Sequence, residues 1–264
     1  MRIAVAGSSG RMGQTIIKKV VCDSELKLVL ALDSLNSKLI DEDATCFMGK
    51  ISGINIENNI ENIKKADCLI DFTRPEGTMS HLSICLKYKI NIVIGTTGFN
   101  KQEKFEILKA SKNIGVVFSP NMSIGINITI KILEIASRML KKGFNVEIFE
   151  AHHNKKIDAP SGTAIAMGEA ISKSWGINLN DVATWTRYGN KCLRNDNNIG
   201  FSVLRGGDII GDHTVYFCGN GERIEITHRS NNRQTYANGS IIAAKFLKDK
   251  KLGCFDMKDV LKLN

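Results

Sequence analysis

The 264-residue sequence lacks the features that would place it in a membrane or among disordered chains. It has no apolar run of about 18 residues, the length that a membrane-spanning helix needs. It has no internal repeat and no low-complexity linker. Its first residues, MRIAVAGSSGRMG, reach glycine too soon for a signal peptide, so we expect a cytoplasmic protein. Hydrophobic residues make up 43% and charged residues 24% of the chain, as is typical of a folded globular protein.

Closely spaced cysteine pairs are also missing. The seven cysteines form no CxxC pair, and their odd number and irregular spacing predict reduced thiols rather than a disulfide framework. Structural zinc usually has paired ligands, so we expect no metal site.

The net charge of +9 does not come from a basic block. The lysines are dispersed and no arginines alternate with aromatic residues, so we expect no nucleic-acid partner. Biased lysine and asparagine usage, or a polyanionic substrate or cofactor, is the simpler explanation of the positive charge.

The first half of the chain alternates short apolar strands with amphipathic helices. This alternation predicts an α/β fold in which a doubly wound parallel sheet, Rossmann-like, has helices on both faces. The predicted strands are 2–6, 27–33, 68–72, 91–97 and 114–120, and the predicted helices are 11–21, 76–87 and 101–111.

The pattern changes near residues 121–124. A long helix at 121–142 precedes strands that alternate more strictly, which predicts a second, α+β domain with a mixed or antiparallel sheet. We therefore expect domains at 1–123 and 124–232, with the helix in 233–264 packing back on the first. The strands of the second domain are predicted at 145–153, 182–187, 201–205, 213–218 and 222–228, with a loop at 188–200 and a final helix at 235–248.

A glycine loop separates the first strand from the first helix. Gly7, Gly10 and Gly13 form GxxGxxG rather than the usual GxGxxG, but they still allow a tight turn and a helix N-terminus that faces an anion. Asp33 ends the second predicted strand, where an acidic side chain would bind a ribose diol. Ser34 stands where an arginine would favour a 2′-phosphate, so the choice between NADH and NADPH stays open. The turns at 71–75 and 95–99 lie at the carboxyl ends of other strands of the predicted parallel sheet. Ligands of open α/β sheets bind at this edge.

A second group of candidate functional residues lies in residues 150–164, EAHHNKKIDAPSGTA. His152 and His153 end a predicted strand and point to opposite faces. Lys156 follows within reach, and a helix beginning near Gly162 offers backbone amides to a carboxylate. An acid–base imidazole, an ammonium and an anion site suit the reduction of an anionic, carboxylate-bearing substrate.

Two other interpretations of this loop remain. His152 and His153 could bind a metal, although adjacent histidines seldom chelate one ion and no third ligand is suitably spaced. The loop could also be merely structural. The remaining histidines are interpreted as hydrogen-bonded bystanders; these are His81, His213 and His228.

In the order GSSGRMG, IDFTRPEGT, GTTGF, SPNMSIGIN, EAHHNKKIDAPSGTA, RGGDIIGDHTV and ERIEITHRS, the motifs resemble those of the bacterial dihydrodipicolinate reductase family. The resemblance runs from end to end, and EAHHNKKIDAPSGTA is its most specific part. It implies hydride transfer from NADH or NADPH to an unsaturated cyclic dicarboxylate. The product is tetrahydrodipicolinate, with loss of water from the 4-hydroxylated precursor, on the diaminopimelate route to lysine.

The resemblance also implies roles for individual residues. His152 is the acid/base residue and Lys156 the proton donor, and the domain at 124–232 binds substrate and assembles a homotetramer. The implied substrate ligands are His153, Gly162, Thr163 and, with less support, Arg233. The implied cofactor contacts are Gly7, Ser8, Ser9, Gly10, Arg11, Met12, Asp33, Gly95, Thr96, Thr97, Ser119, Pro120, Asn121 and Met122.

Two alternatives come from other classes of protein. Another nicotinamide-dependent reductase, such as one acting on a semialdehyde, would be favoured by an essential cysteine nucleophile at a strand–helix turn, and none is evident. A non-catalytic dinucleotide sensor would not need the proton-transferring side chains of His152 and Lys156.

Overall fold

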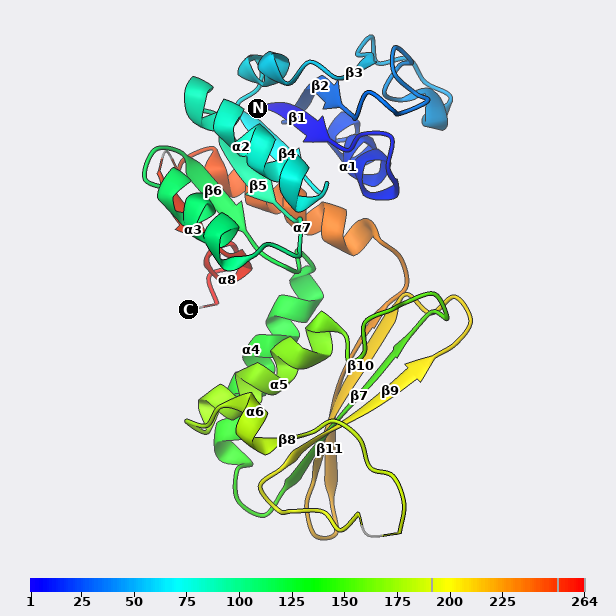
Figure 1. Ribbon diagram of the computed structural model, residues 1–264, viewed down its shortest axis with the longest axis vertical. Coiled ribbons are helices and arrows are strands. Elements are labelled where there is room, and N and C mark those ends of the chain that lie inside the picture. Colours follow the sequence, from blue (N-terminus) through cyan, green and yellow to red (C-terminus); the bar gives the residue numbers. More distant parts are fainter. Residues whose placement is uncertain (191, 251, 264) are drawn as a thin grey trace. The chain divides into compact units, whose positions relative to one another are not determined.

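The computed structural model describes residues 1–190, 192–250 and 252–263. The chain forms two compact units (Figure 1). The first unit comprises Met1–Ile124 and Arg233–Asn264, and the second comprises Gly125–Asn232. Within the described ranges, no helix is both long and apolar enough to cross a membrane.

The first unit is built on a seven-stranded parallel sheet, in the order β12-β6-β5-β4-β1-β2-β3, which confirms the predicted fold class. Its strands are β1 (Arg2–Ala6), β2 (Lys27–Leu32), β3 (Ile56–Glu57), β4 (Cys68–Asp71), β5 (Asn91–Ile94), β6 (Gly115–Phe118) and β12 (Gly253–Phe255). Its helices are α1 (Arg11–Val21), α2 (Pro75–Tyr88), α3 (Lys101–Ala110), α7 (Gln234–Leu247) and α8 (Met257–Val260), with short 3-10 helices η1 (Cys46–Met48) and η2 (Ile60–Lys65).

Alternate residues of β1 enter two separate apolar cores, one on each face of the sheet. Ile3 and Val5 pack in the core that contains α1 and α7, whereas Ala4 and Ala6 belong to the core that contains α2 and α3. Burial on both faces explains why residues 3–6, IAVA, are continuously apolar, whereas Arg2 at the start of the strand is exposed.

Helix α7 brings the C-terminal segment back onto the first unit. A Cβ at Gly239 would lie 1.7 Å from the carbonyl oxygen of Met122, so only glycine permits this close crossing. The Asn91 side chain donates a hydrogen bond of 2.9 Å to the Leu247 carbonyl and fixes the end of the helix. Strand β12 and helix α8 follow α7 in the chain, and the pattern of apolar residues did not predict either of them.

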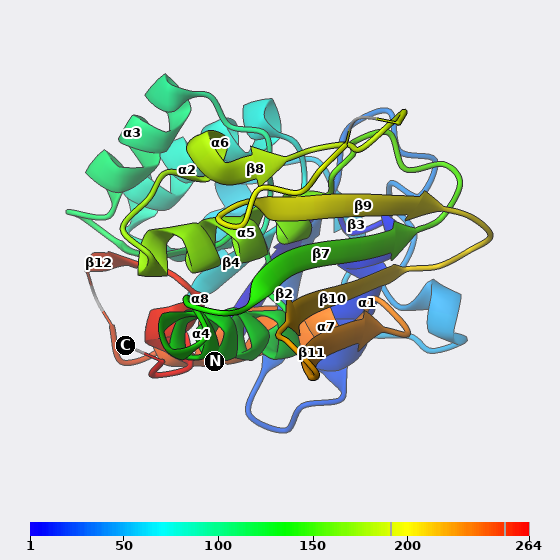
Figure 2. The same ribbon diagram turned by 90° about the horizontal axis from the view of Figure 1, so that it is seen from below.

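The second unit has a five-stranded mixed sheet in the order β11-β10-β7-β9-β8. Its strands are β7 (Asn145–His152), β8 (Ala183–Thr184), β9 (Ile199–Arg205), β10 (Gly211–Cys218) and β11 (Arg223–Ser230), and its helices are α4 (Ile124–Met139), α5 (Gly162–Ser174) and α6 (Leu179–Val182). Central strand β7 runs parallel to β9 and antiparallel to β10, and Figure 2 shows these strands side by side.

Several boundaries differ from the prediction. The strand predicted at 182–187 is shorter in the structure, because Val182 ends helix α6 and β8 comprises only Ala183 and Thr184. The predicted loop at 188–200 is shorter, since β9 begins at Ile199, and Lys191 lies outside the described residues. Helix α4 begins at Ile124 rather than at 121.

Candidate active site

The loop between β1 and α1 forms a compact glycine turn. Gly7 has a φ of +69°, a conformation that favours glycine, and its carbonyl accepts a hydrogen bond of 3.0 Å from the Gly10 amide. A Cβ at Gly13 would lie 2.1 Å from the Gly7 carbonyl oxygen. No side chain caps the N-terminus of α1 at Gly10. The first amides of this helix therefore remain suited to an anionic ligand.

Asp33 lies directly beside this turn. Its Oδ2 accepts hydrogen bonds from the amide and the hydroxyl of Ser9, at 2.7 and 2.6 Å, and its Oδ1 accepts one of 2.7 Å from the Ser34 amide. A carboxylate can accept about four hydrogen bonds, so capacity for a ligand hydroxyl remains. The buried Ser8 hydroxyl has no hydrogen-bond partner within the described part of the chain.

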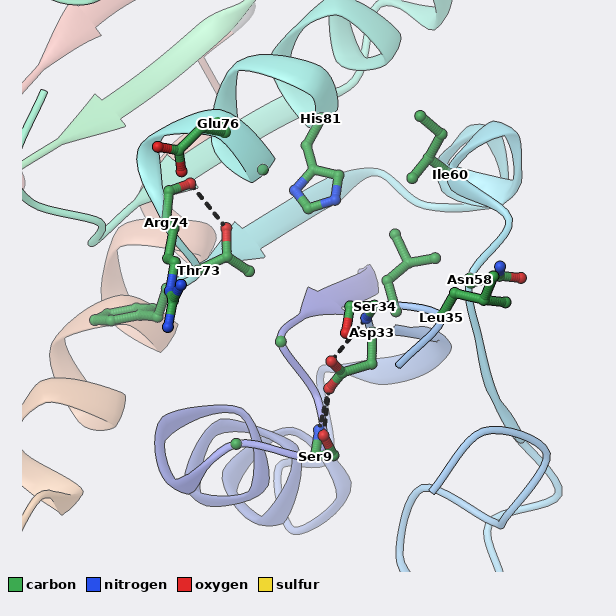
Figure 3. Close-up of a pocket in the computed structure, with 15 residues that line it drawn as sticks. Ser9, Asp33, Ser34, Leu35, Asn58, Ile60, Thr73, Arg74, Glu76 and His81 are labelled. Carbon is green, nitrogen blue, oxygen red and sulfur yellow. Dashed lines mark hydrogen bonds between the residues drawn. The ribbon is translucent and has the colours of Figure 1, made fainter. Parts of the chain in front are cut away.

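These residues open onto a cavity of about 840 Å³ in the first unit (Figure 3). Ser9 and Asp33 form one side of it, and Thr73, Arg74 and His81 lie opposite. The cavity is lined by Gly7, Ser9, Gly10, Leu32, Asp33, Ser34, Leu35, Asn58, Ile60, Phe72, Thr73, Arg74, Glu76, Gly77 and His81. Its volume, the glycine turn and the Asp33 carboxylate fit the phosphate and ribose of a dinucleotide.

The other predicted cofactor residues do not line this cavity. Gly95 and Thr96 follow β5, and a Cβ at Gly95 would lie 2.3 Å from the Phe72 ring. Thr96 is buried and accepts a hydrogen bond of 2.9 Å from Thr78. Ser119, after β6, donates a hydrogen bond of 3.0 Å to the Asn121 carbonyl. The remaining positions are Arg11 and Met12 in the first turn of α1, Thr97 and Pro120 at exposed loop positions, and the buried Met122.

His81 and Asp71 form a hydrogen-bonded pair that the sequence did not lead us to expect. Asp71 is fully buried at the end of β4, and its carboxylate accepts hydrogen bonds of 2.8 Å from both His81 Nδ1 and the Thr73 amide. The interpretation of His81 as a bystander missed its place in the cavity wall. The turn at residues 71–75, at the carboxyl end of a predicted strand, was the feature of the sequence that could have indicated this part of the cavity wall.

In the second unit, the predicted catalytic histidine is one member of a buried ionic cluster. His152 Nδ1 lies 2.5 Å from Glu150 Oε2, because the two residues alternate onto the same face of β7. Arg205, opposite His152 on β9, donates to both carboxylate oxygens of Glu150 at 2.8 and 2.7 Å. A Cβ at Gly211 on β10 would lie 3.0 Å from His152 Nε2, so this glycine leaves room for the ring.

The loop after β7 carries the other two basic candidates. Lys156 Nζ donates to both carboxylate oxygens of Asp158, at 2.7 and 2.8 Å. His153 Nδ1 accepts a hydrogen bond of 3.2 Å from the Lys155 amide. Arg205 also donates to the Asp158 carbonyl at 2.6 Å, so the loop that carries Lys156 is attached to the cluster around His152.

The helix predicted to begin near Gly162 is confirmed as α5. Ser161 is its N-cap and accepts a hydrogen bond of 3.2 Å from the Ala164 amide, while its own amide donates to Glu150 Oε1 at 2.9 Å. Gly162 is exposed and Thr163 half-buried in the first turn. Arg233, the remaining predicted substrate ligand, belongs to the first unit, where it precedes α7.

His213 is a further buried neighbour of the cluster. Its ring packs edge-to-face against His152 with centroids 5.1 Å apart, and its Nε2 lies 2.9 Å from the Ser161 hydroxyl. Burial, aided by the charge of His152, lowers the pKa of His213 to about 3. Sequence reasoning did not single out Glu150, although the two-residue spacing on one strand places it on the same face as His152. It missed Arg205 and interpreted His213 as a bystander, because only long-range strand pairing brings these two residues to the cluster.

The lowered pKa of His213 predicts a pH-dependent stability. Below the ordinary value of 6.5 the unfolded chain binds a proton that the folded chain does not bind. His213 should therefore lower the free energy of unfolding by up to about 1.4 kcal/mol per pH unit as the pH falls below that value. We expect His213→Gln to reduce this slope in urea unfolding measured between about pH 6.5 and 5. Equal slopes for the two proteins would contradict the assignment.

Comparison with known proteins places the chain in a family. The family model described as dihydrodipicolinate reductase, N-terminus, matches residues 1–122, and the corresponding C-terminus model matches residues 125–261. The 4-hydroxy-tetrahydrodipicolinate reductase of Bordetella pertussis is 53% identical over 99% of this chain and 97% of that protein. The protein of the same name from Herminiimonas arsenicoxydans is 52% identical over 100% of this chain and 98% of its own.

A solved structure shows the same fold. It is the dipicolinate-bound dihydrodipicolinate reductase from Paenisporosarcina sp. TG-14, with a TM-score of 0.73 and 24% identity over 97% of both chains. The two family models together cover nearly the whole sequence, and the resemblance predicted from the motifs is confirmed. The chain belongs to the dihydrodipicolinate reductase family.

Proposed function

We propose that this protein reduces 4-hydroxy-tetrahydrodipicolinate, by way of dihydrodipicolinate, to tetrahydrodipicolinate with NADH or NADPH, on the diaminopimelate route to lysine. The observation that carries this proposal is the second unit's cluster, in which an imidazole, an ammonium and an anion-binding helix start share one loop region. The name of the Bordetella pertussis relative and the dipicolinate in the solved relative support the substrate class.

The chain's own residues would bind the substrate and move protons. The amides of Gly162 and Thr163 begin helix α5, whose positive dipole end favours a carboxylate. His153 would contact the substrate from the preceding loop. Lys156 would donate the proton that neutralises the reduced substrate, and His152 would act as acid or base. A bound nicotinamide supplies the hydride.

The first unit would hold the coenzyme. The turn at Gly7–Gly10 and the start of α1 would bind its phosphates, and Asp33 would accept hydrogen bonds from a ribose hydroxyl. The loops at Gly95–Thr97 and Ser119–Met122 follow neighbouring strands of the same parallel sheet, where ligands of open α/β sheets bind. Both NADH and NADPH belong to the proposal.

A cytoplasmic location and a homotetramer formed by the second unit complete the proposal. The family resemblance supports both. Sedimentation equilibrium should give four times the 29.1 kDa chain mass, and a monomer would contradict this part.

A coupled assay tests the reaction. Dihydrodipicolinate synthase generates the substrate in place, and NADH or NADPH oxidation is followed in separate reactions. We expect oxidation that requires both this protein and the synthase, and that dipicolinate inhibits. Absence of oxidation with both coenzymes would refute the proposed function.

A further inference from the structure

Glu150 is the buried acid in direct contact with the proposed catalytic histidine. Its side chain is 1% exposed. Its two oxygens meet four donor atoms: His152 Nδ1 at 2.5 Å, both terminal nitrogens of Arg205, and the Ser161 amide at 2.9 Å. An ionised carboxylate is an acceptor only and offers about four sites, so this environment matches the charged form of Glu150.

The charge of Glu150 decides which nitrogen of His152 carries hydrogen. Burial alone would raise the pKa of Glu150, but the hydrogen bonds from His152, Arg205 and Ser161 lower it to about 2. Since the carboxylate cannot donate, the hydrogen of this contact belongs to Nδ1. In the neutral imidazole, Nε2 is then the atom with the free lone pair.

The sheet fixes this geometry. Glu150 and His152 are two residues apart on β7 and share one face, and Arg205 lies opposite His152 on the parallel strand β9. Arg205 also donates to the Asp158 carbonyl at 2.6 Å. The Arg205 guanidinium therefore binds both the Glu150 carboxylate, which contacts His152, and the loop that carries Lys156.

We propose that Glu150 is a positioning residue of the reaction. It accepts the hydrogen bond of His152 Nδ1, so that Nε2 is the nitrogen that exchanges a proton with the substrate, and Arg205 keeps the carboxylate in place. This inference rests on the proposed function for the identity of the reaction, but the state of the imidazole ring is a property of the protein alone.

The first test replaces the acid and keeps its size. The side-chain amide that Glu150→Gln introduces can donate to Nδ1 and stabilise the wrong tautomer, so kcat should fall about 100-fold while the affinity for dipicolinate changes less than about threefold. The matched control is Glu147→Gln on the same strand. Glu147 is also held by both terminal nitrogens of an arginine, Arg187 at 2.8 Å, but it does not contact His152, and the kcat of this control should stay near that of the wild type.

A double variant separates positioning from general stabilisation. If Glu150 acts through His152, adding Glu150→Gln to His152→Gln should cause almost no further loss of kcat. An equal loss in both backgrounds would overturn the proposal, as would full kcat in the single variant Glu150→Gln.

Nitrogen-15 NMR of the histidine rings gives a result that does not depend on turnover. The His152 signals, assigned by their loss in His152→Gln, should show the Nδ1–H tautomer in the wild type, and the Nε2–H form should increase in Glu150→Gln. If Glu150→Gln fails to fold, the wild-type spectrum decides alone, and a dominant Nε2–H tautomer would overturn the proposal. An inactive wild type with the Nδ1–H tautomer would refute the proposed function and not this inference.

Discussion

Replacing His152 by glutamine, or Lys156 by alanine, should each lower kcat by about 100-fold or more, the range expected for loss of a positioned acid or base. Glutamine keeps a donor for Glu150 but cannot exchange a proton at the ring position. Alanine at 156 removes the ammonium that lies 2.7 Å from Asp158 and leaves the backbone turn intact. Steady-state kinetics with saturating coenzyme measure both effects.

The neighbouring lysine provides the matched control. Lys155 is exposed in the same loop, with its amide bonded to His153 and no proposed contact with substrate through its side chain. Lys155→Ala should therefore keep kcat close to the wild-type value. Near-normal turnover in both His152→Gln and Lys156→Ala would show that the site has been assigned to the wrong residues.

Gly13→Ala should lower the stability of the protein and weaken its binding of NADH. Its Cβ would lie 2.1 Å from the Gly7 carbonyl oxygen and 2.7 Å from the Ser8 Cα, and backbone atoms cannot move aside as a flexible side chain can. We expect a loss of about 3 kcal/mol or more in the free energy of unfolding, at the upper end for an overpacked site. The folded fraction should bind NADH at least about tenfold more weakly, because the displaced turn no longer presents its amides.

Gly206→Ala controls for the change of residue type. A Cβ there would meet only the Leu204 side chain, at an ordinary contact distance of 3.5 Å. Its stability and NADH affinity should stay close to those of the wild type, as measured by urea unfolding and by fluorescence titration of NADH. Wild-type stability and NADH affinity in Gly13→Ala would contradict the tight turn.

The sequence predicted well what depends on local periodicity. The stretches IAVA at residues 3–6 and CLI at residues 68–70 are continuously apolar because both faces of the parallel sheet are buried, and that pattern distinguishes the first unit from the second. The N-terminus of α5 was also predictable, since Ser161 is a good N-cap and Gly162 follows it. Short elements such as β8 and β12 were not predictable, because two or three residues are too few to show a periodic pattern of apolar side chains.

The environment of His152 could not be predicted in the same way. Glu150 stands two residues away, so its shared face with His152 follows from strand geometry. Arg205 and His213 are 55 residues from Glu150 and 52 from Ser161, respectively, and only the order β10-β7-β9 brings them together. The glycine turn was predicted despite its departure from GxGxxG, because the close approach of Gly13 to Gly7 meets the same physical demand.

The hydrogen that NADH transfers to the substrate can be followed directly. NADH carrying deuterium on both C4 positions is incubated with this protein and substrate made by the synthase, and the product is examined by mass spectrometry. We expect one deuterium on a ring carbon of tetrahydrodipicolinate, and far less labelled product in the same time when His152→Gln and Lys156→Ala are combined. Product without deuterium, or NADH oxidation that yields no tetrahydrodipicolinate, would contradict the proposed function.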